Sequence, residues 1–241
     1  MHGTAGQGPA LLVSRAPLDR ATIVGACVEL VEELGVDGLT MRRLGDRLGV
    51  DPTAVYRHFR DKDELLRAVG DHAHGEVLGG LSTDLSSGPW RAVVRELCVR
   101  LRAAHLARPD LAALVRTGPP LQEHELRLTE TLLRELRRAR LGDDEIVLAY
   151  HSLIELTVGA AAIDAPMSTL PPRERAGAYR GWRQAYASLD ADRFPESVRL
   201  AASLYPADAD TRFEHALDRL LDGIAPRSRR IAPARAARRD P

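Results

Sequence analysis

The sequence predicts an all-α protein. Apolar residues recur at spacings of three and four through most of the 241 residues, which is the pattern of helices with one buried face. No segment shows the strict alternation that a half-buried strand requires. Prolines and glycines interrupt the helical pattern at intervals typical of helix ends. We therefore expect a small N-terminal unit of short helices, followed by a larger helical domain.

The composition is that of an ordinary soluble protein, with 44% hydrophobic and 28% charged residues. Basic and acidic residues balance at 34 each, so any nucleic-acid-binding surface must arise from local charge. Cys27 and Cys98 form no CxxC pair or disulfide framework, which fits a reducing cytoplasm. The N-terminus lacks a signal-peptide pattern. The longest apolar run, 153–163, contains Glu155 and is shorter than the about 20 residues that span a bilayer. We expect a soluble, cytoplasmic protein.

The first helix is predicted from Leu18, because its apolar residues form one stripe. Gly35 follows this stripe and can end the helix in a left-handed conformation. The residues of the stripe are Ile23, Cys27, Leu30 and Leu34.

Three short helices follow, each with a recognisable start. Thr40 can cap the second helix through its hydroxyl. Asp51 can cap the third, and Pro52 fits the first helical position because no N–H is needed there. The fourth begins with a capping box formed by Asp61 and Glu64.

The larger domain is predicted to contain further helices, separated by proline and glycine. Pro166, for example, sets the end of the most apolar helix. The predicted ranges are 90–107, 110–117, 120–140, 143–164, 172–189, 195–204 and 211–223.

The third helix exposes polar and aromatic side chains that a protein core does not need. Its inward residues, Val55 and Phe59, attach it to its neighbours, because so short a helix is not stable alone. Residues 42–62 carry six bases against three acids, and phosphate binding requires such a surface. A plain three-helix unit with a solvated charged face explains the periodicity equally well. The helix lengths and the four-residue turn favour DNA binding.

The segment GLTMRRLGDRLGVDPTAVYRHFRDKDELL resembles the DNA-binding signature of tetracycline-repressor (TetR) family transcriptional regulators. The similarity covers about 18–69 and includes the Gly-Leu-Thr entry, the Leu-Gly-Val turn and the Val-Tyr-Arg-His-Phe core that ends at Lys62. The resemblance implies a homodimeric, ligand-responsive regulator of double-stranded operator DNA, most simply a repressor that a small molecule releases from a palindromic operator. The implied DNA contacts are Thr40, Met41, Arg42, Pro52, Thr53, Ala54, Tyr56, Arg57, His58 and Lys62.

This sequence departs from the family pattern early in the recognition helix. The common base-reading position there is Pro52 or Thr53, and neither has a long polar side chain. Arg42 and Thr53 are therefore better candidates for base contacts than the other implied residues.

The resemblance also divides the chain into domains. Residues 1–15 form a flexible tail, and 16–66 a homeodomain-like helix-turn-helix unit that binds DNA. Residues 67–225 form a larger helical domain for effector binding and dimerisation, and 226–241 a basic, disordered tail. The fourth helix belongs to both domains, so we expect it to transmit effector binding.

Candidate effector contacts in the larger domain begin with His151 and Glu155, which share one helix face at a spacing of four. A hydrogen-bonded pair at an interface is the alternative. Tetracycline repressors use a histidine for a magnesium-chelated drug where this chain has Leu114, Val115 and Arg116, which argues against such a ligand. We expect a small, lipophilic effector and no metal or cofactor. The other candidate contacts are His105, Leu114, Val115 and Tyr150.

Two segments are candidates for a homodimer interface. Small residues, among them Gly159 and Ala162, allow close helix approach in the first. In the second, Phe213, Leu217 and Leu220 share one stripe. Packing within one chain is the alternative for both. A dimer would place two recognition helices about 34–36 Å apart, which suits a palindrome.

Other functions have less support. The sequence contains no nucleophile elbow, phosphate loop or Cys and His metal spacing, so we do not expect an enzyme. An activator or an effector-independent DNA-binding protein remains open, as does an all-α enzyme or interaction module in which the helix-turn-helix is only a scaffold.

Overall fold

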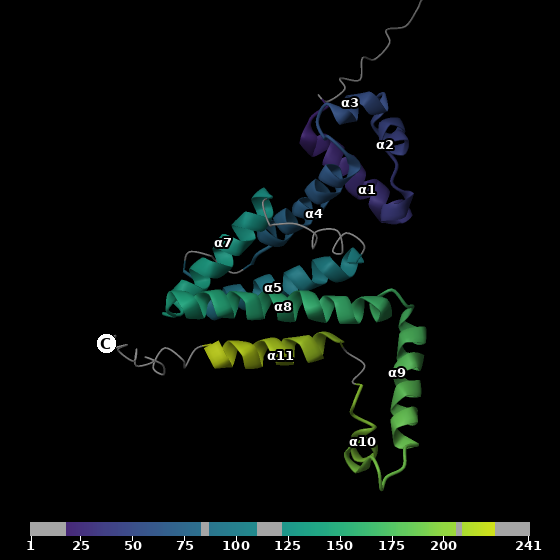
Figure 1. The fold of residues 1–241 in the computed structure, drawn as a ribbon, viewed down its shortest axis with the longest axis vertical. Helices are drawn as coiled ribbons and strands as arrows, with labels where there is room; N and C mark the ends of the chain where they lie inside the picture. Colours follow the sequence, from purple (N-terminus) through teal and green to yellow (C-terminus); the bar gives the residue numbers. More distant parts are fainter. Residues whose placement is uncertain (1–17, 83–86, 110–121, 206–208, 225–241) are drawn as a thin grey trace, which may run out of the picture. The chain divides into compact units, whose positions relative to one another are not determined.

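The computed structural model describes residues 18–82, 87–109, 122–205 and 209–224 (Figure 1). These residues form helices and the turns between them, and no strand occurs among them. They fall into two compact units, one up to Leu65 and one from Leu66. Both predicted tails, the predicted helix 110–117, and Leu114 and Val115 lie outside the described residues.

The first unit contains three helices and the beginning of a fourth. They are α1 (Arg20–Gly38), α2 (Met41–Leu48), α3 (Pro52–Tyr56) and α4 (Lys62–Gly79). α2 packs against both α1 and α3. Apolar side chains from every one of these helices, and from the turn after α3, meet in a dry core. Its most buried members are Ile23, Cys27, Leu44, Val55, Phe59 and Leu65.

The N-caps predicted at Thr40, Asp51 and Asp61 are present, but the predicted capping box is incomplete, because the Glu64 carboxylate accepts the amide N–H of Arg60 at 2.8 Å instead of that of Asp61. The Thr40 hydroxyl accepts the amide N–H of Arg43 at 3.2 Å. Asp51 accepts the amide of Thr53 at 2.8 Å, and Asp61 accepts that of Glu64 at 2.7 Å. These contacts satisfy amides that have no partner within their own helix. The starts of α2, α3 and α4 are therefore fixed by local chemistry.

Two details of α1 differ from the prediction. Gly35 has a φ of 71°, as expected of a left-handed residue, but helical structure resumes after this kink and continues to Gly38. Leu34, the residue before this kink, is 47% exposed. The prediction that Leu34 belongs to the buried stripe is wrong.

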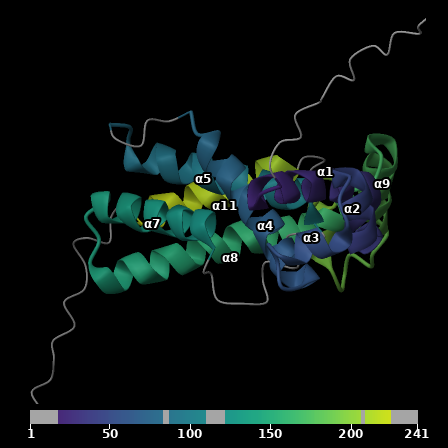
Figure 2. The same cartoon turned by 90° about the horizontal axis from the view of Figure 1, so that it is seen from above.

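The second unit has a core built by four helices and the later turns of α4. The four are α5 (Trp90–Ala107), α7 (Glu123–Arg138), α8 (Asp143–Ser168) and α11 (Ala209–Ile224). α8 packs against α5, α7 and α11, and these helices lie side by side in Figure 1 and Figure 2. The core centres on Val94, Leu97, Leu132, Leu153 and Leu217.

The remaining two helices form what we call the arm, residues 172–205. It consists of α9 (Pro172–Ala187), α10 (Pro195–Leu200) and the turn that follows. In Figure 1, α9 leaves the end of α8 steeply and α10 lies beside its far end. Four aromatic rings hold the arm together, with centroid separations of 5.0–6.4 Å: Tyr179, Trp182, Tyr186 and Tyr205.

The helix limits of the second unit differ from the prediction at several places. α8 continues through Pro166, which was expected to end it, and stops at Ser168. The proline leaves only the carbonyl of Ala162 without its helical partner, and Ala162 is exposed, so water can satisfy that oxygen. α7 begins at Glu123, three residues later than predicted, and α10 ends four residues earlier, at Leu200.

α8 is also longer than the apolar run that predicted it. Its 26 residues are long and apolar enough, by length and composition, to cross a membrane, contrary to the expectation from the run alone. A core helix has the same properties, and α8 contributes Leu153 and Ala161 to the core of the second unit.

Candidate DNA-binding surface and effector region

The turn between α2 and α3 is tight because two glycines permit it. Gly49 ends α2 with a φ of 64° and a ψ of 36°, a left-handed conformation that favours glycine. Gly45 lies so close to the following turn that an added Cβ would be 2.8 Å from the carbonyl oxygen of Val50. The same Cβ would be 3.2 Å from the ring of Pro52, the first residue of α3. Gly45 therefore sets how closely α3 approaches α2.

Gly45→Ala should destabilise the protein by about 1–3 kcal/mol, because the methyl group must displace backbone atoms. Helix propensity alone would favour alanine at an interior helical position. Gly25→Ala on α1 is the matched control, since nothing lies within 4 Å of its Cβ position. Urea denaturation followed by far-UV circular dichroism measures both variants. Equal or greater stability of Gly45→Ala would contradict the close packing.

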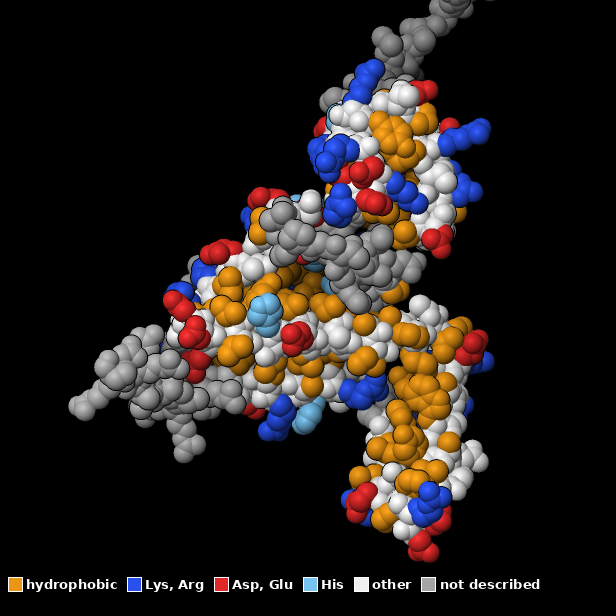
Figure 3. Space-filling view, in the orientation of Figure 1, with side chains coloured by type: hydrophobic (Ala, Val, Ile, Leu, Met, Phe, Trp, Pro, Cys, Tyr) orange, Lys and Arg blue, Asp and Glu red, His pale blue; other side chains and the backbone are white. Residues whose placement is uncertain are grey.

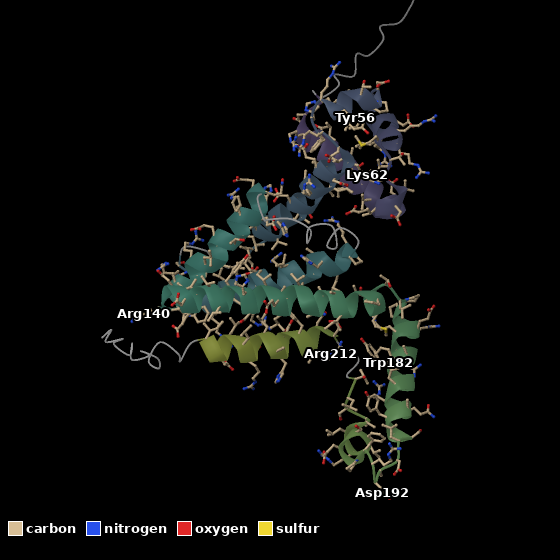
Figure 4. All side chains as sticks on the ribbon, in the orientation of Figure 1. Tyr56, Lys62, Arg140, Trp182, Asp192 and Arg212 are labelled. Carbon is tan, nitrogen blue, oxygen red and sulfur yellow. The ribbon has the colours of Figure 1, made fainter. Side chains whose placement is uncertain are left out.

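The predicted DNA contacts lie at the beginnings of α2, α3 and α4, at the end of α3 and in the turn that follows it. Thr40, Arg42, Thr53, Tyr56 and Arg57 are exposed, and the Tyr56 side chain is 49% exposed although it is large and aromatic (Figure 4). The other predicted contacts are half-buried: Met41, Pro52, Ala54, His58 and Lys62. Val55 and Phe59 are buried beneath them, as predicted.

The six bases counted in 42–62 are not equivalent. Arg47 forms ion pairs with Glu29 at 3.0 Å and Glu33 at 2.5 Å, both on α1. Lys62 donates from Nζ to the carbonyl oxygen of Leu39 at 2.9 Å, immediately before α2. Arg43 donates to the carbonyl oxygen of Gly38 at 2.7 Å, and Arg60 pairs with the carboxylate of Glu64. Four of the six therefore hold the unit together at least in part.

The guanidinium groups of Arg42 and Arg57 make no hydrogen bond or ion pair with any part of the chain that the structure describes. Both are exposed, and they lie on α2 and directly after α3. Figure 3 shows basic side chains spread over the surface of this unit. These two guanidinium groups can therefore reach phosphates or base edges without first breaking an internal contact.

Arg20 is a positioning residue that the sequence did not reveal. Its guanidinium lies 4.0 Å from the centre of the Phe59 ring, hydrogen-bonds to the carbonyl oxygen of His58 and pairs with Glu64 at 3.1 Å. It thereby ties the first turn of α1 to the segment between α3 and α4. An arginine 38 residues before His58 gives no sequence signal of such a contact.

The effector candidates of α8 do not converge on the interior. His151 and Glu155 are exposed, and neither has a hydrogen bond or ion pair among the described residues. Tyr150, the neighbouring candidate, turns inward and its hydroxyl lies 3.2 Å from that of Thr129 on α7. Both side chains share one exposed face of α8, as their spacing predicts, so a ligand that contacts them must lie on the surface of the single chain.

His105 lies in the last turn of α5 and is half-buried, near a second histidine on α4. The His74 ring on α4 is 6.4 Å from the His105 ring. His74 is only 8% exposed, and its Nδ1 is buried with no hydrogen-bond partner. Its position on the stripe of Leu66, Val69 and Val77 is the signal that predicts burial.

Burial lowers the pKa of His74 below its ordinary 6.5, and nearby His124 acts in the same direction, while Asp71 opposes both. A lowered pKa means that the folded protein resists protonation that the unfolded chain accepts. We therefore expect stability to fall as the pH drops below about 6.5. Urea denaturation at several pH values should show that acid lowers the free energy of unfolding less in His74→Leu than in the unchanged protein. The charged and titratable groups around the ring, Asp71, His105 and His124, remain in this variant. His215→Gln, at an exposed position, should keep the wild-type pH dependence; an unchanged dependence in His74→Leu would exclude His74 as its source.

The candidate residues for a dimer interface fall into a buried group and an accessible group. Phe213 and Leu217 are buried in the core of the second unit, so their assignment to a dimer face is wrong and packing within the chain explains them. Leu220 is half-buried, Ala162 is exposed, and no atom lies within 4 Å of a Cβ at Gly159. These three remain available to a second copy.

An apolar cleft of about 300 Å³ lies between α8 and α11. Leu148 and Leu220 line it, with Glu145 and Arg219 among its polar residues. Leu148 is 67% exposed and Ile163, further along α8, is 78% exposed. Figure 3 shows hydrophobic side chains along α8 and over the arm. A large exposed apolar surface of this kind is typical of a protein interface.

Comparison with known proteins identifies this arrangement. Residues 83–227 match the family described as "Tetracyclin repressor-like, C-terminal domain", and residues 23–69 match "Bacterial regulatory proteins, tetR family". The chain belongs to the TetR family. It is therefore a ligand-responsive, DNA-binding transcriptional regulator, as the helix-turn-helix signature predicts.

TetR-family relatives cover nearly the whole chain. The tetracycline repressor protein class A from transposon 1721 of Escherichia coli is 30% identical over 218 residues, 86% of this chain and 90% of the relative. The HTH-type transcriptional repressor DrrR1 of Streptomyces coeruleorubidus is 28% identical, over 86% of this chain and 76% of its own. The structure of Streptomyces coelicolor ActR in complex with actinorhodin has a TM-score of 0.76 at 28% identity, covering 89% of this chain and all of that one.

TetR-family regulators bind operator DNA as dimers and respond to small-molecule effectors. The relatives of this chain are soluble transcriptional regulators and not enzymes. Within the described ranges, no three His, Cys, Asp or Glu side chains gather in a way that could hold a metal ion.

Proposed function

We propose that this chain is a cytoplasmic repressor, which binds a palindromic operator as a homodimer and is released by a small lipophilic effector. The observation that carries the proposal is the exposed set of Arg42, Tyr56 and Arg57 on a helix pair whose inward residues are fully buried. A repressor is favoured over an activator because curated relatives that match most of the chain are named as repressors.

Residues 16–66 are assigned to DNA binding. Arg42 and Thr53 contact base edges, because both are exposed near the start of their helices. Tyr56, Arg57 and His58 contact the groove and the backbone, and these contacts set the position of α3 on the duplex. The remaining proposed contacts are Thr40, Met41, Pro52, Ala54 and Lys62.

Residues 67–225 are assigned to dimerisation and effector binding. The proposed dimer face follows the exposed side of α8 through Leu148, Glu155, Gly159 and Ala162, with Leu220 beside it on α11. His151 belongs to this face rather than to the effector site. Pairing along this face would bury apolar side chains that the single chain leaves in water, and it would hold two recognition helices for one palindrome.

The proposed effector site lies among α4, α5, α7 and α8. Most of the buried side chains of these helices are apolar, which favours a lipophilic ligand. His105 and Tyr150 supply the polar contacts that orient it. ActR, one of the similar proteins, is known in complex with actinorhodin. The effector acts by preferring the conformation that does not fit the operator, and a preference of about 1.4 kcal/mol changes operator occupancy tenfold.

The test is binding to DNA from the region flanking the chain's own gene. We expect fluorescence anisotropy to detect a complex whose affinity falls steeply as salt concentration rises, because phosphate contacts release counterions. Sedimentation velocity on the same sample should give a dimer bound to one palindrome. If purified protein shows no salt-dependent binding to any such fragment, the proposed function is excluded.

A further inference from the structure

The carboxylate of Asp71 on α4 caps a different helix, α7. Its Oδ1 accepts the amide N–H of Glu125 at 2.9 Å, and its Oδ2 accepts that of His124 at 3.3 Å. The Nδ1 of His124 also lies 2.8 Å from Oδ2. Asp71 is 53 residues away in sequence and is buried. One carboxylate of α4 therefore lies within hydrogen-bond distance of three nitrogens in the first turn of α7.

α7 depends on this contact because it has no cap of its own. The residue before it, Gln122, forms no capping hydrogen bond through its side chain. The first amides of a helix have no partner within that helix, and the positive end of the helix dipole favours a carboxylate. Asp71 supplies both the acceptor and the charge. Loss of Asp71 would leave two amides without a protein partner.

A close packing contact holds the two helices in the same register. The His124 ring lies directly over Gly75, one turn after Asp71 on α4, and a Cβ at position 75 would be 2.9 Å from that ring. Glycine at this position permits the approach that the hydrogen bonds require. We call these contacts of Asp71, Gly75 and His124 the α4 clamp.

We propose that the α4 clamp fixes the orientation of α4 that operator binding requires. This inference rests on the proposed function. α4 begins in the first unit, which carries the DNA contacts, and continues into the second, where the clamp holds it to α7. A helix that is free to change its angle must be ordered when both recognition helices bind, and that ordering reduces apparent affinity. Because the clamp already orders α4 in the free protein, binding to the operator does not lose this conformational entropy.

The experiment compares Asp71→Ala and Asp71→Asn with the unchanged full-length protein. We expect Asp71→Ala to bind the flanking DNA fragment about tenfold more weakly, within the usual range of coupling between sites. Asp71→Asn should lose less, because its amide oxygen can still accept one N–H. Amide hydrogen exchange should become faster at His124 and Glu125 in Asp71→Ala. The matched control is Glu123→Ala, which also removes one carboxylate near the first turn of α7, but from an exposed position on α7 itself.

Three results decide the inference. Weaker operator binding by Asp71→Ala, with Glu123→Ala unchanged and both proteins fully helical at the assay temperature, supports the clamp. Unchanged operator affinity in Asp71→Ala overturns it, even if exchange is faster, because the contact is then only structural. If the unchanged protein binds no fragment, the proposed function fails, and this outcome is distinct because the Asp71 variants then have no affinity to compare.

Discussion

Asp164→Ala should destabilise the second unit by about 3–5 kcal/mol, the usual cost of removing one partner from a buried ion pair. Asp164 lies on α8 and is buried. Its two oxygens accept the guanidinium of Arg102 on α5 at 2.7 Å and that of Arg212 on α11 at 2.8 Å. Arg102, only 4% exposed, also pairs with Asp210 at 2.6 Å. Removing Asp164 takes a carboxylate contact away from both guanidinium groups.

The contacts around this group of charges explain why the loss should be large. The Arg102 guanidinium lies 4.9 Å from the centre of the Phe213 ring, and that of Arg212 lies 5.8 Å from the centre of the Tyr179 ring, in the arm. Asp164 therefore connects α5, α8, α11 and the first part of the arm. No water can replace a carboxylate that is buried between two positive charges without a penalty.

Two matched variants separate this effect from a general loss of charge. Asp210→Ala removes a partner of the same arginine, but the Asp210 side chain is 69% exposed, so we expect a smaller loss. Glu196→Ala breaks an exposed pair with Arg199 and should change stability by less than about 1 kcal/mol. Urea denaturation measures all three variants. If Asp164→Ala lowered the free energy of unfolding by less than Asp210→Ala does, burial of the Asp164 carboxylate would add no net stability.

Replacing Arg42 and Arg57 together with alanine should reduce operator affinity at least a hundredfold. Each arginine contact to a base or phosphate is worth about 1–3 kcal/mol, and each lost phosphate contact lowers the slope of affinity against salt by about one. The effect should be large because both guanidinium groups are exposed and make no described contact within the chain. Anisotropy titrations at several salt concentrations give both quantities.

Arg47→Ala is the control for this variant. It also removes a positive charge from the helix-turn-helix, but Arg47 is already neutralised by Glu29 and Glu33. We expect a much smaller loss of affinity and an unchanged salt slope. If Arg47→Ala weakened operator binding as much as replacement of Arg42 and Arg57 does, the affinity would depend on the total charge of the unit and not on the two available arginines.

The sequence by itself determined the features that arise from neighbouring residues. Caps such as Thr40, Asp51 and Asp61 act on amides two or three positions away, and Gly49 needs only its own backbone freedom. Because such interactions are local, the residues around each helix start predict that start, and together they form the helix-turn-helix signature. The same local pattern identified the buried residues Val55 and Phe59.

Only the tertiary structure decided which partners distant residues find. A stripe on α11 is equally consistent with an interface or a core, and the packing of α5 and α8 placed Phe213 and Leu217 in the core. The arginines of the helix-turn-helix look alike in sequence, yet α1 carboxylates engage Arg47 and leave Arg42 available. Asp71 and Asp164 acquire their roles from partners more than 40 residues away. Burial, charge pairing and tertiary capping depend on the approach of separate helices, and no local pattern encodes that approach.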